Sequence, residues 1–141
     1  MATTTSTVRE AMTSSPSAIS KEANVRQAAQ LMMSAGVGSL PVVDGESLVG
    51  IVTDRDLVRE VLAEDRDPKQ MTVGECCTEK LVVVSPDEPL DAALQRMARE
   101  QVRRLPVVED GRLVGMLAQA DVARTATPQS TGQMVEEISQ G

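Results

Sequence analysis

The chain contains one sequence unit twice. Residues 40–43, Leu-Pro-Val-Val, recur as residues 105–108, 65 positions later (105 − 40). The same spacing, kept without a gap, pairs identical residues along most of the chain, among them Val8 with Val73, Ala28 with Ala93, Asp56 with Asp121 and Arg59 with Arg124. An accident of composition does not hold one frame over such a distance. The fold is therefore built from two copies of one supersecondary unit.

Each copy predicts the same series of elements. In the first copy, an apolar stripe at helical spacing predicts a core-facing helix that Gly36 ends; the stripe consists of Val25, Ala28, Ala29, Met32 and Met33. Two apolar segments around Asp44-Gly45 are typical of a hairpin. The elements expected in the two copies are a short helix (7–12; 73–77), a short strand (17–19; 82–84), a helix (25–35; 90–100), two strands (40–43 and 48–52; 105–108 and 113–117) and a closing helix (54–63; 119–124).

The repeat sets the expected domain boundaries. The first copy spans residues 8–63 and the second residues 73–126, with a charged linker at 64–72 and a polar tail at 127–141, in which residues 133–138 can form a further helix. The predicted strands are almost entirely apolar, so both of their faces need cover. One copy has too few helices for this, and we expect the two copies to pack sheet to sheet.

Composition excludes several classes of function. The chain has no Phe, Trp, Tyr or His, so its core is aliphatic, and the commonest general base and metal ligand is missing. A net charge of −7 disfavours binding to a nucleic-acid backbone. The polar start and the short apolar runs predict neither a signal peptide nor a membrane span. Adjacent Cys76 and Cys77 form no disulfide framework, so we expect a soluble, cytoplasmic protein.

The segment that follows the last strand of the first copy, Gly50-Ile51-Val52-Thr53-Asp54-Arg55-Asp56, resembles the signature of a CBS motif. The pair of copies looks like a Bateman module and is similar to free-standing bacterial two-CBS proteins of the hypoxic-response type. The resemblance implies an α+β fold of mixed α/β type, with two β-α-β-β-α units packed sheet to sheet with pseudo-twofold symmetry. It further implies a non-catalytic regulatory module that binds an adenosine-type nucleotide (AMP, ADP, ATP or S-adenosylmethionine class) in the cleft between the copies. A homodimer and an effector protein are the other implied partners, and no cofactor or metal is required.

The resemblance also assigns candidate ligand contacts to the ends of the strands. Thr53 lies where a strand passes into a helix and would face an anion such as phosphate, while Asp56 would hold the ribose in the first copy. Asp121 would hold the ribose in the second copy, where Ala118 replaces the hydroxyl. Arg103 and Arg104 would contact phosphate oxygens in the second copy. The alternative is that Thr53 and Asp56 cap a helix and that the two arginines are solvated surface charge.

Further residues complete the expected nucleotide site. Ala18 and Val83 lie in the lead-in strands, which would supply backbone and aliphatic contacts to the base. The remaining members of the set are Ser15, Ser39, Pro41 and Arg55.

Two other functions remain open from the sequence. Because Ala118 lacks the hydroxyl and Gly38-Ser39 replace the arginines, the chain is also compatible with an interaction or dimerisation scaffold whose ligand pockets are vestigial. A thiol enzyme that uses Cys76 or Cys77 would need a low thiol pKa and would be alkylated rapidly at neutral pH.

Overall fold

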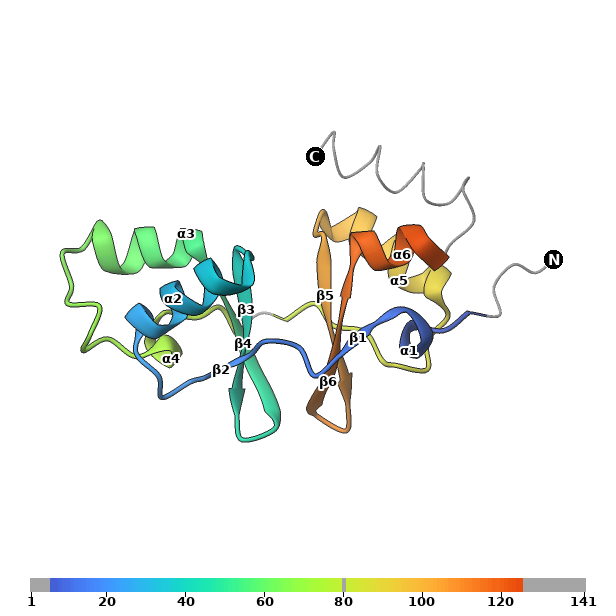
Figure 1. The fold of residues 1–141 in the computed structure, drawn as a ribbon, viewed down its shortest axis with the longest axis horizontal. Coiled ribbons are helices and arrows are strands. Elements are labelled where there is room, and N and C mark those ends of the chain that lie inside the picture. The colour runs from blue at the N-terminus through green and yellow to red at the C-terminus, as the bar shows by residue number, and fades with distance from the viewer. Residues whose placement is uncertain (1–5, 80, 126–141) are drawn as a thin grey trace. The chain divides into compact units, whose positions relative to one another are not determined.

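The structure, a computed structural model, describes residues 6–79 and 81–125 of the 141-residue chain (Figure 1). The described residues form two compact units. One, the central unit, lies within residues 17–81; the other, the split unit, combines residues from 1–16 and 82–141. The elements in chain order are α1 (Val8–Ala11), β1 (Thr13–Ser14), β2 (Ile19–Ser20), α2 (Val25–Ala35), β3 (Ser39–Asp44), β4 (Ser47–Thr53), α3 (Asp54–Leu57), the π-helical segment η1 (Val58–Leu62), α4 (Val73–Cys76), α5 (Leu90–Glu100), β5 (Arg104–Glu109), β6 (Arg112–Ala118) and α6 (Gln119–Thr125).

In the central unit, strands β2, β3 and β4 pair in that order. Strand β2 runs parallel to β3, and β3 pairs antiparallel with β4 through a turn in which Gly45 has a φ of 64°. Helices α2 and α3 pack against this hairpin (Figure 1). Helix α2 begins at Asn24, whose side chain accepts a hydrogen bond from Gln27 N at 2.8 Å, and ends at Gly36 in the left-handed conformation. These local signals explain why the predicted bounds of this helix are confirmed.

The split unit repeats the same arrangement. Strand β6 pairs antiparallel with both β5 and β1, and helices α5 and α6 follow the order of α2 and α3. The register of β5 on β6 shifts between Val107 and Val108, and the register of β3 on β4 shifts at the equivalent pair, Val42 and Val43. The duplication predicted from the sequence thus extends to an irregularity of the backbone, and the mixed helix and strand fold is confirmed.

Each sequence copy begins with a short helix. In the structure, this helix does not pack with the rest of its own copy but belongs to the compact unit formed by the other copy. Helix α4, which begins the second copy, packs on β2 and β4 of the central unit, and Val73 N donates to Ala23 O at 2.8 Å. Helix α1, which begins the first copy, packs against α5 and α6 in the split unit. The compact units are therefore divided at 16/17 and 81/82, whereas the sequence copies are contiguous.

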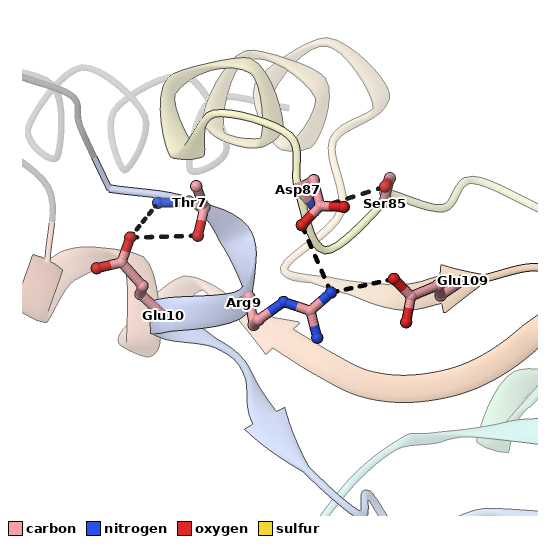
Figure 2. A network of polar contacts seen from close by, with 6 residues as sticks. All are labelled: Thr7, Arg9, Glu10, Ser85, Asp87 and Glu109. Atoms are coloured by element: carbon pink, nitrogen blue, oxygen red, sulfur yellow. Dashed lines mark hydrogen bonds and ion pairs between the residues drawn. The ribbon is translucent and has the colours of Figure 1, made fainter.

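Helix α1 is held in the split unit by its backbone and by one arginine. Val8 is fully buried, and its N–H donates to Glu88 O at 3.0 Å. Nη2 of Arg9 lies 3.4 Å from Oδ1 of Asp87 and 3.0 Å from Oε2 of Glu109 (Figure 2). These ion-pair side chains are 43–77% exposed. Pairs as exposed as these contribute less than about 1 kcal/mol each, so burial of Val8 does most to fix the helix.

Each unit has its own aliphatic core. The central unit buries Ile19, Val25, Ala28, Met32, Leu40, Val42, Val52, Val61, Met71, Val73 and Cys76. The split unit buries Val8, Val84, Leu90, Ala93, Leu94, Met97, Leu105, Val107, Leu117 and Val122. Branched aliphatic chains fill most of the space, and methionines fill irregular gaps, which is how a chain without aromatic residues can reach close packing.

The structure corrects two expectations about the core and the closing helix. Met33, placed on the buried stripe of α2 by its spacing, is 84% exposed. It follows Met32 directly, and two consecutive helical residues are about 100° apart, so only Met32 reaches the core. The closing helix expected at 54–63 changes after Leu57 into the π-helical segment η1. The helix expected at 133–138 lies outside the described residues.

The strand expected at 82–84 is reduced to one bridge, between Val84 and Val107. In the central unit, the equivalent strand continues because Lys21 N donates to Val43 O at 2.9 Å. The counterpart of Lys21 in the second copy is Pro86, which has no N–H to donate. The strand pairing therefore stops one residue earlier, at Val84, the equivalent of Ile19.

Candidate functional site

The junction between β4 and α3 carries the first two predicted ligand contacts. Oγ1 of Thr53 accepts a hydrogen bond from Asp56 N at 3.0 Å, and Oδ2 of Asp56 accepts one from Thr53 N at 2.9 Å. This reciprocal pair is a capping box, so the capping role proposed as an alternative is observed. It also fixes the Asp56 carboxylate in one direction while leaving it half-buried.

The equivalent junction of the split unit keeps half of this arrangement. Oδ2 of Asp121 accepts a hydrogen bond from Ala118 N at 3.1 Å. Ala118 has no hydroxyl, so the return bond of a capping box cannot form. Asp121 is only 7% exposed and is the one charged side chain classed as buried among the described residues. The two acids thus take the same place in both units, although their surroundings differ in polarity.

The loop before each hairpin is fastened to its junction. Asp54 N donates to Gly38 O at 2.9 Å, and Gln119 N donates to Arg103 O at 2.8 Å. Strand register then sets Ser39 opposite Thr53, and sets Arg104 opposite Ala118. In the split unit, both arginines are exposed.

The structure therefore gathers the predicted contacts into two sets, one in each unit. Ser39, Thr53 and Asp56 come together in the central unit. The corresponding set in the split unit consists of Arg103, Arg104 and Asp121.

The other predicted contacts are spread over both units. Ala18 is half-buried just before β2, Pro41 is buried within β3, and Arg55 is exposed in the first turn of α3. Ser15 lies in the split unit, exposed, with a left-handed φ of 52°. The carbonyl of Val83 accepts a hydrogen bond from Nη1 of Arg96 at 2.6 Å, a contact that was not predicted.

A pocket of about 410 Å³ in the central unit was also not predicted. It lies between the end of α2 and the start of α3, and its lining is mostly apolar: Ala29, Met32, Met33, Gly36, Val37, Gly38, Asp54 and Leu57. A Cβ atom at Gly38 would lie 3.1 Å from Oδ2 of Asp54, so glycine makes room for that carboxylate. The sequence signal for this pocket was the consecutive pair Met32 and Met33. Neighbouring helical residues point in different directions, so one of the two methionines had to lie outside the core.

The two cysteines are free thiols that lie close to Asp56. Burial, followed by the negative charge of Asp56, raises the pKa of Cys76 to about 11 from its ordinary value of 9.0. Burial, followed by the charge of Glu79, also raises the pKa of Cys77. Raised thiol pKa values disfavour a nucleophilic role at neutral pH. Among the described residues, no group of three or more Cys, Asp or Glu side chains is arranged to hold a metal ion.

We expect Cys76 to react slowly with iodoacetamide at neutral pH. A pKa of about 11 in place of 9.0 lowers the thiolate fraction about a hundredfold, and the labelling rate should fall by a similar factor relative to the urea-unfolded protein. Mass spectrometry of the Cys77→Ala protein measures Cys76 alone. The folded state holds the proton more tightly, so stability should fall as the pH rises from about 9 toward 11. Labelling of the folded protein at the unfolded rate would restore the thiol-enzyme hypothesis.

Comparison with known proteins defines the class to which this arrangement belongs. The sequence model of the CBS domain matches residues 8–63 and 73–127, which together make up most of the chain. The chain therefore belongs to the CBS-domain family and carries two such domains in tandem.

Individual relatives agree with this assignment over nearly their whole length. The chain is 37% identical to the CBS domain-containing protein YhcV of Bacillus subtilis over 135 residues, 95% of this chain and 96% of that protein. It is similar to the crystal structure of Hypoxic Response Protein I with two coordinated zinc ions, with a TM-score of 0.75, 35% identity and coverage of 84% of this chain and 98% of that one. It is also similar to CBSX2 in complex with AMP, with a TM-score of 0.71, 31% identity and coverage of 84% and 93%. The expected resemblance to two-CBS proteins of the hypoxic-response type is confirmed.

None of the helices in the described part of the chain combines the length and the apolar character that crossing a bilayer requires.

Proposed function

We propose that the chain is a non-catalytic regulatory module that binds an adenosine-type nucleotide, of the AMP, ADP, ATP or S-adenosylmethionine class, through Asp56 and Asp121. The observation that carries the proposal is the repeated position of these acids, each of which accepts a hydrogen bond from the last residue of a strand, at 2.9 and 3.1 Å. The AMP complex of the similar CBSX2 supports the choice of ligand.

The capping role of Asp56 is compatible with binding ribose. An ionised carboxylate offers about four acceptor positions, and the cap uses one of them, on Oδ2. Oδ1 of Asp56 makes no hydrogen bond within the described part of the chain. The cap holds this oxygen in a fixed direction, which lowers the ordering cost of accepting a ribose hydroxyl.

The two sites are proposed to be unequal. Ser39 in the central unit corresponds in register to Arg104 in the split unit. Exposed guanidinium groups suit phosphate oxygens, so we propose that the split unit favours the nucleotides with more phosphate. The central unit, with the complete Thr53–Asp56 pair, depends more on the ribose.

Replacing Asp56 with alanine should abolish nucleotide binding to the central unit. In the unmodified protein, a nucleotide at about a hundred times its dissociation constant should add roughly 2.7 kcal/mol to the free energy of unfolding. Scanning calorimetry or an external dye must report this, because the chain has no Trp or Tyr. The ligands to compare are AMP, ADP, ATP and S-adenosylmethionine.

A matched control separates the loss of a ligand contact from the loss of a cap. Glu10 occupies the same capping-box position in α1 that Asp56 occupies in α3 (Figure 2). The Glu10→Ala variant should lose a comparable stability, about 1 kcal/mol, and keep the full response to nucleotide. If no nucleotide shifts the melting of the unmodified protein, the scaffold function replaces the sensor function.

We also propose that the module forms a homodimer through exposed apolar side chains of the central unit, Met33 on α2 and Val58 and Leu62 on η1. We further propose that the dimer is the form that binds an effector protein. These side chains are 84%, 53% and 71% exposed, an unusual exposure for large apolar groups. Arg59 and Glu60, which follow Val58 in the chain, have opposite signs, so this surface can face its own copy without net repulsion. The free thiols fit a reducing cytoplasm.

Replacing Leu62 with glutamate should convert the dimer to a monomer, because the apolar contact would bury a carboxylate that has no partner there. Light scattering coupled to size-exclusion chromatography measures the mass. The control is Ser34→Glu, which adds the same charge at the exposed residue next to Met33 and should leave the dimer intact. A mass that does not change in Leu62→Glu would place the interface elsewhere.

A further inference from the structure

A polar clamp fastens the lead-in segment of the split unit. Nη1 of Arg96, on α5, donates to Val83 O at 2.6 Å and to Oε2 of Glu88 at 3.2 Å, while Nη2 donates to Oε1 of Glu88 at 2.8 Å. Oε2 of Glu88 in turn accepts from Ser85 N at 2.6 Å. Both charged side chains are only 26% exposed. The hydrogen bond from Arg96 holds the pKa of Glu88 below its usual range, so the pair stays ionised at neutral pH.

The clamp exists in one unit only. The residues of the central unit at the positions of Arg96, Glu88 and Val83 are Leu31, Ala23 and Ala18, none of which has a polar side chain. The clamp holds the segment around Val83 in place of the strand pairing that Pro86 prevents, because this segment keeps a single bridge to β5. The two lead-in segments therefore present different groups: an unclamped backbone at Ala18 and a backbone carbonyl engaged by a guanidinium at Val83.

This difference changes which base each segment can accept. Adenine presents an amino donor at position 6 and needs an acceptor such as a backbone carbonyl. The bond from Arg96 uses one of the two lone pairs of Val83 O and crowds it, which makes this carbonyl a poorer acceptor for an amino group, and a guanidinium offers donors only. Nε and one N–H of Nη2 of Arg96 carry no hydrogen bond to other described residues. A purine with an oxygen at position 6 can accept from such donors, as guanine accepts from arginine in nucleic-acid complexes.

We infer that Arg96 is a specificity-determining residue that makes the split unit prefer a 6-oxopurine nucleotide, of the inosine or guanosine type, while the central unit prefers an adenosine nucleotide. The inference rests on the proposed function, in which the segments at Ala18 and Val83 lie against the base. It keeps the adenosine-type ligand for the central unit and revises the ligand of the split unit, so that one chain would compare the concentrations of two classes of purine nucleotide.

The test compares AMP with IMP, which share ribose and phosphate and differ in the group at position 6. Calorimetric titration of Asp56→Ala reports the split unit, and titration of Asp121→Asn reports the central unit. We expect Asp56→Ala to bind IMP at least as tightly as AMP, and Asp121→Asn to bind AMP about tenfold more tightly than IMP.

Arg96 itself is tested in the Asp56→Ala background. Arg96→Leu, which installs the residue of the central unit, should weaken the binding of IMP about tenfold relative to AMP. Arg96→Lys should keep part of the preference, because the ammonium group still donates hydrogen bonds but lacks the planar fork. The control Arg99→Leu alters the same helix at a side chain 70% exposed and should leave the ratio unchanged. Far-UV circular dichroism checks that each variant folds.

The outcomes separate the two proposals. Equal AMP to IMP ratios in Asp56→Ala and Asp121→Asn, or a ratio that Arg96→Leu and Arg96→Lys both leave unchanged, overturn the role of Arg96 and leave the proposed function intact. The absence of any nucleotide binding to the unmodified protein removes the proposed function and this inference together.

Discussion

Replacing Gly50 with valine is expected to unfold the central unit or to destabilise it by more than about 3 kcal/mol, because no space exists for a side chain there. A Cβ atom at Gly50 would lie 2.7 Å from Sγ of Cys77 and 2.9 Å from the carbonyl oxygen of Thr78. The latter oxygen accepts from Ile51 N at 3.0 Å, so the contacting backbone is tied to the same strand. Gly50→Ala should cost about 1–3 kcal/mol in urea unfolding followed by far-UV circular dichroism.

The second copy supplies the control for this prediction. A Cβ atom at Gly115 would meet Sδ of Met12 at 2.5 Å and the carbonyl oxygen of Thr13 at 3.0 Å. Met12 has a long flexible side chain that can rotate away, whereas the short side chain of Cys77 cannot. Gly115→Ala should therefore cost less than Gly50→Ala. A neutral Gly50→Ala substitution would mean that the segment from α4 does not cross β4 at this distance.

The glycine contacts also show what the sequence could predict and what it could not. Both long helices were predicted with their observed bounds, because their spacing and the cap at Gly36 are local properties of the chain. The helices α1 and α4 were predicted as well, but not the unit in which each packs. A helix of four residues has no periodic face that could select a partner. Because α4 and α1 pack with the other copy, the residues that follow them contact Gly50 and Gly115. The sequence did not predict this packing, so the need for glycine at both positions was missed as well.

The sequence predicted which residues form the candidate site better than it predicted the contacts among them. The repeat identified Asp56 and Asp121, and the structure gives both acids the same hydrogen bond. The clamp at Arg96 was missed, because its partners are 8 and 13 positions away and do not recur in the first copy. Differences between the copies gave a signal only at expected contact positions such as Ala118 and Arg103, and Arg96 is not one of those positions. The missing N–H of Pro86 was visible in the sequence but was not used, and a strand was predicted at 82–84.

Truncating Leu105 to alanine is expected to lower the free energy of unfolding by about 2–5 kcal/mol, the cost of a cavity in a close-packed core. Leu105 is fully buried in the cluster of the split unit, opposite Leu117 in the register of β5 and β6. Leu40 holds the same position in the central unit and is 1% exposed, so Leu40→Ala should cost a similar amount.

The chain offers the same substitution at an exposed site as a control. Leu62→Ala removes the same atoms from a side chain that is 71% exposed, so it should change the stability of the protomer by less than about 0.5 kcal/mol. Calorimetry of the three variants at a concentration low enough to keep the protein monomeric measures the comparison. A Leu105→Ala protein as stable as Leu62→Ala would contradict the assigned core.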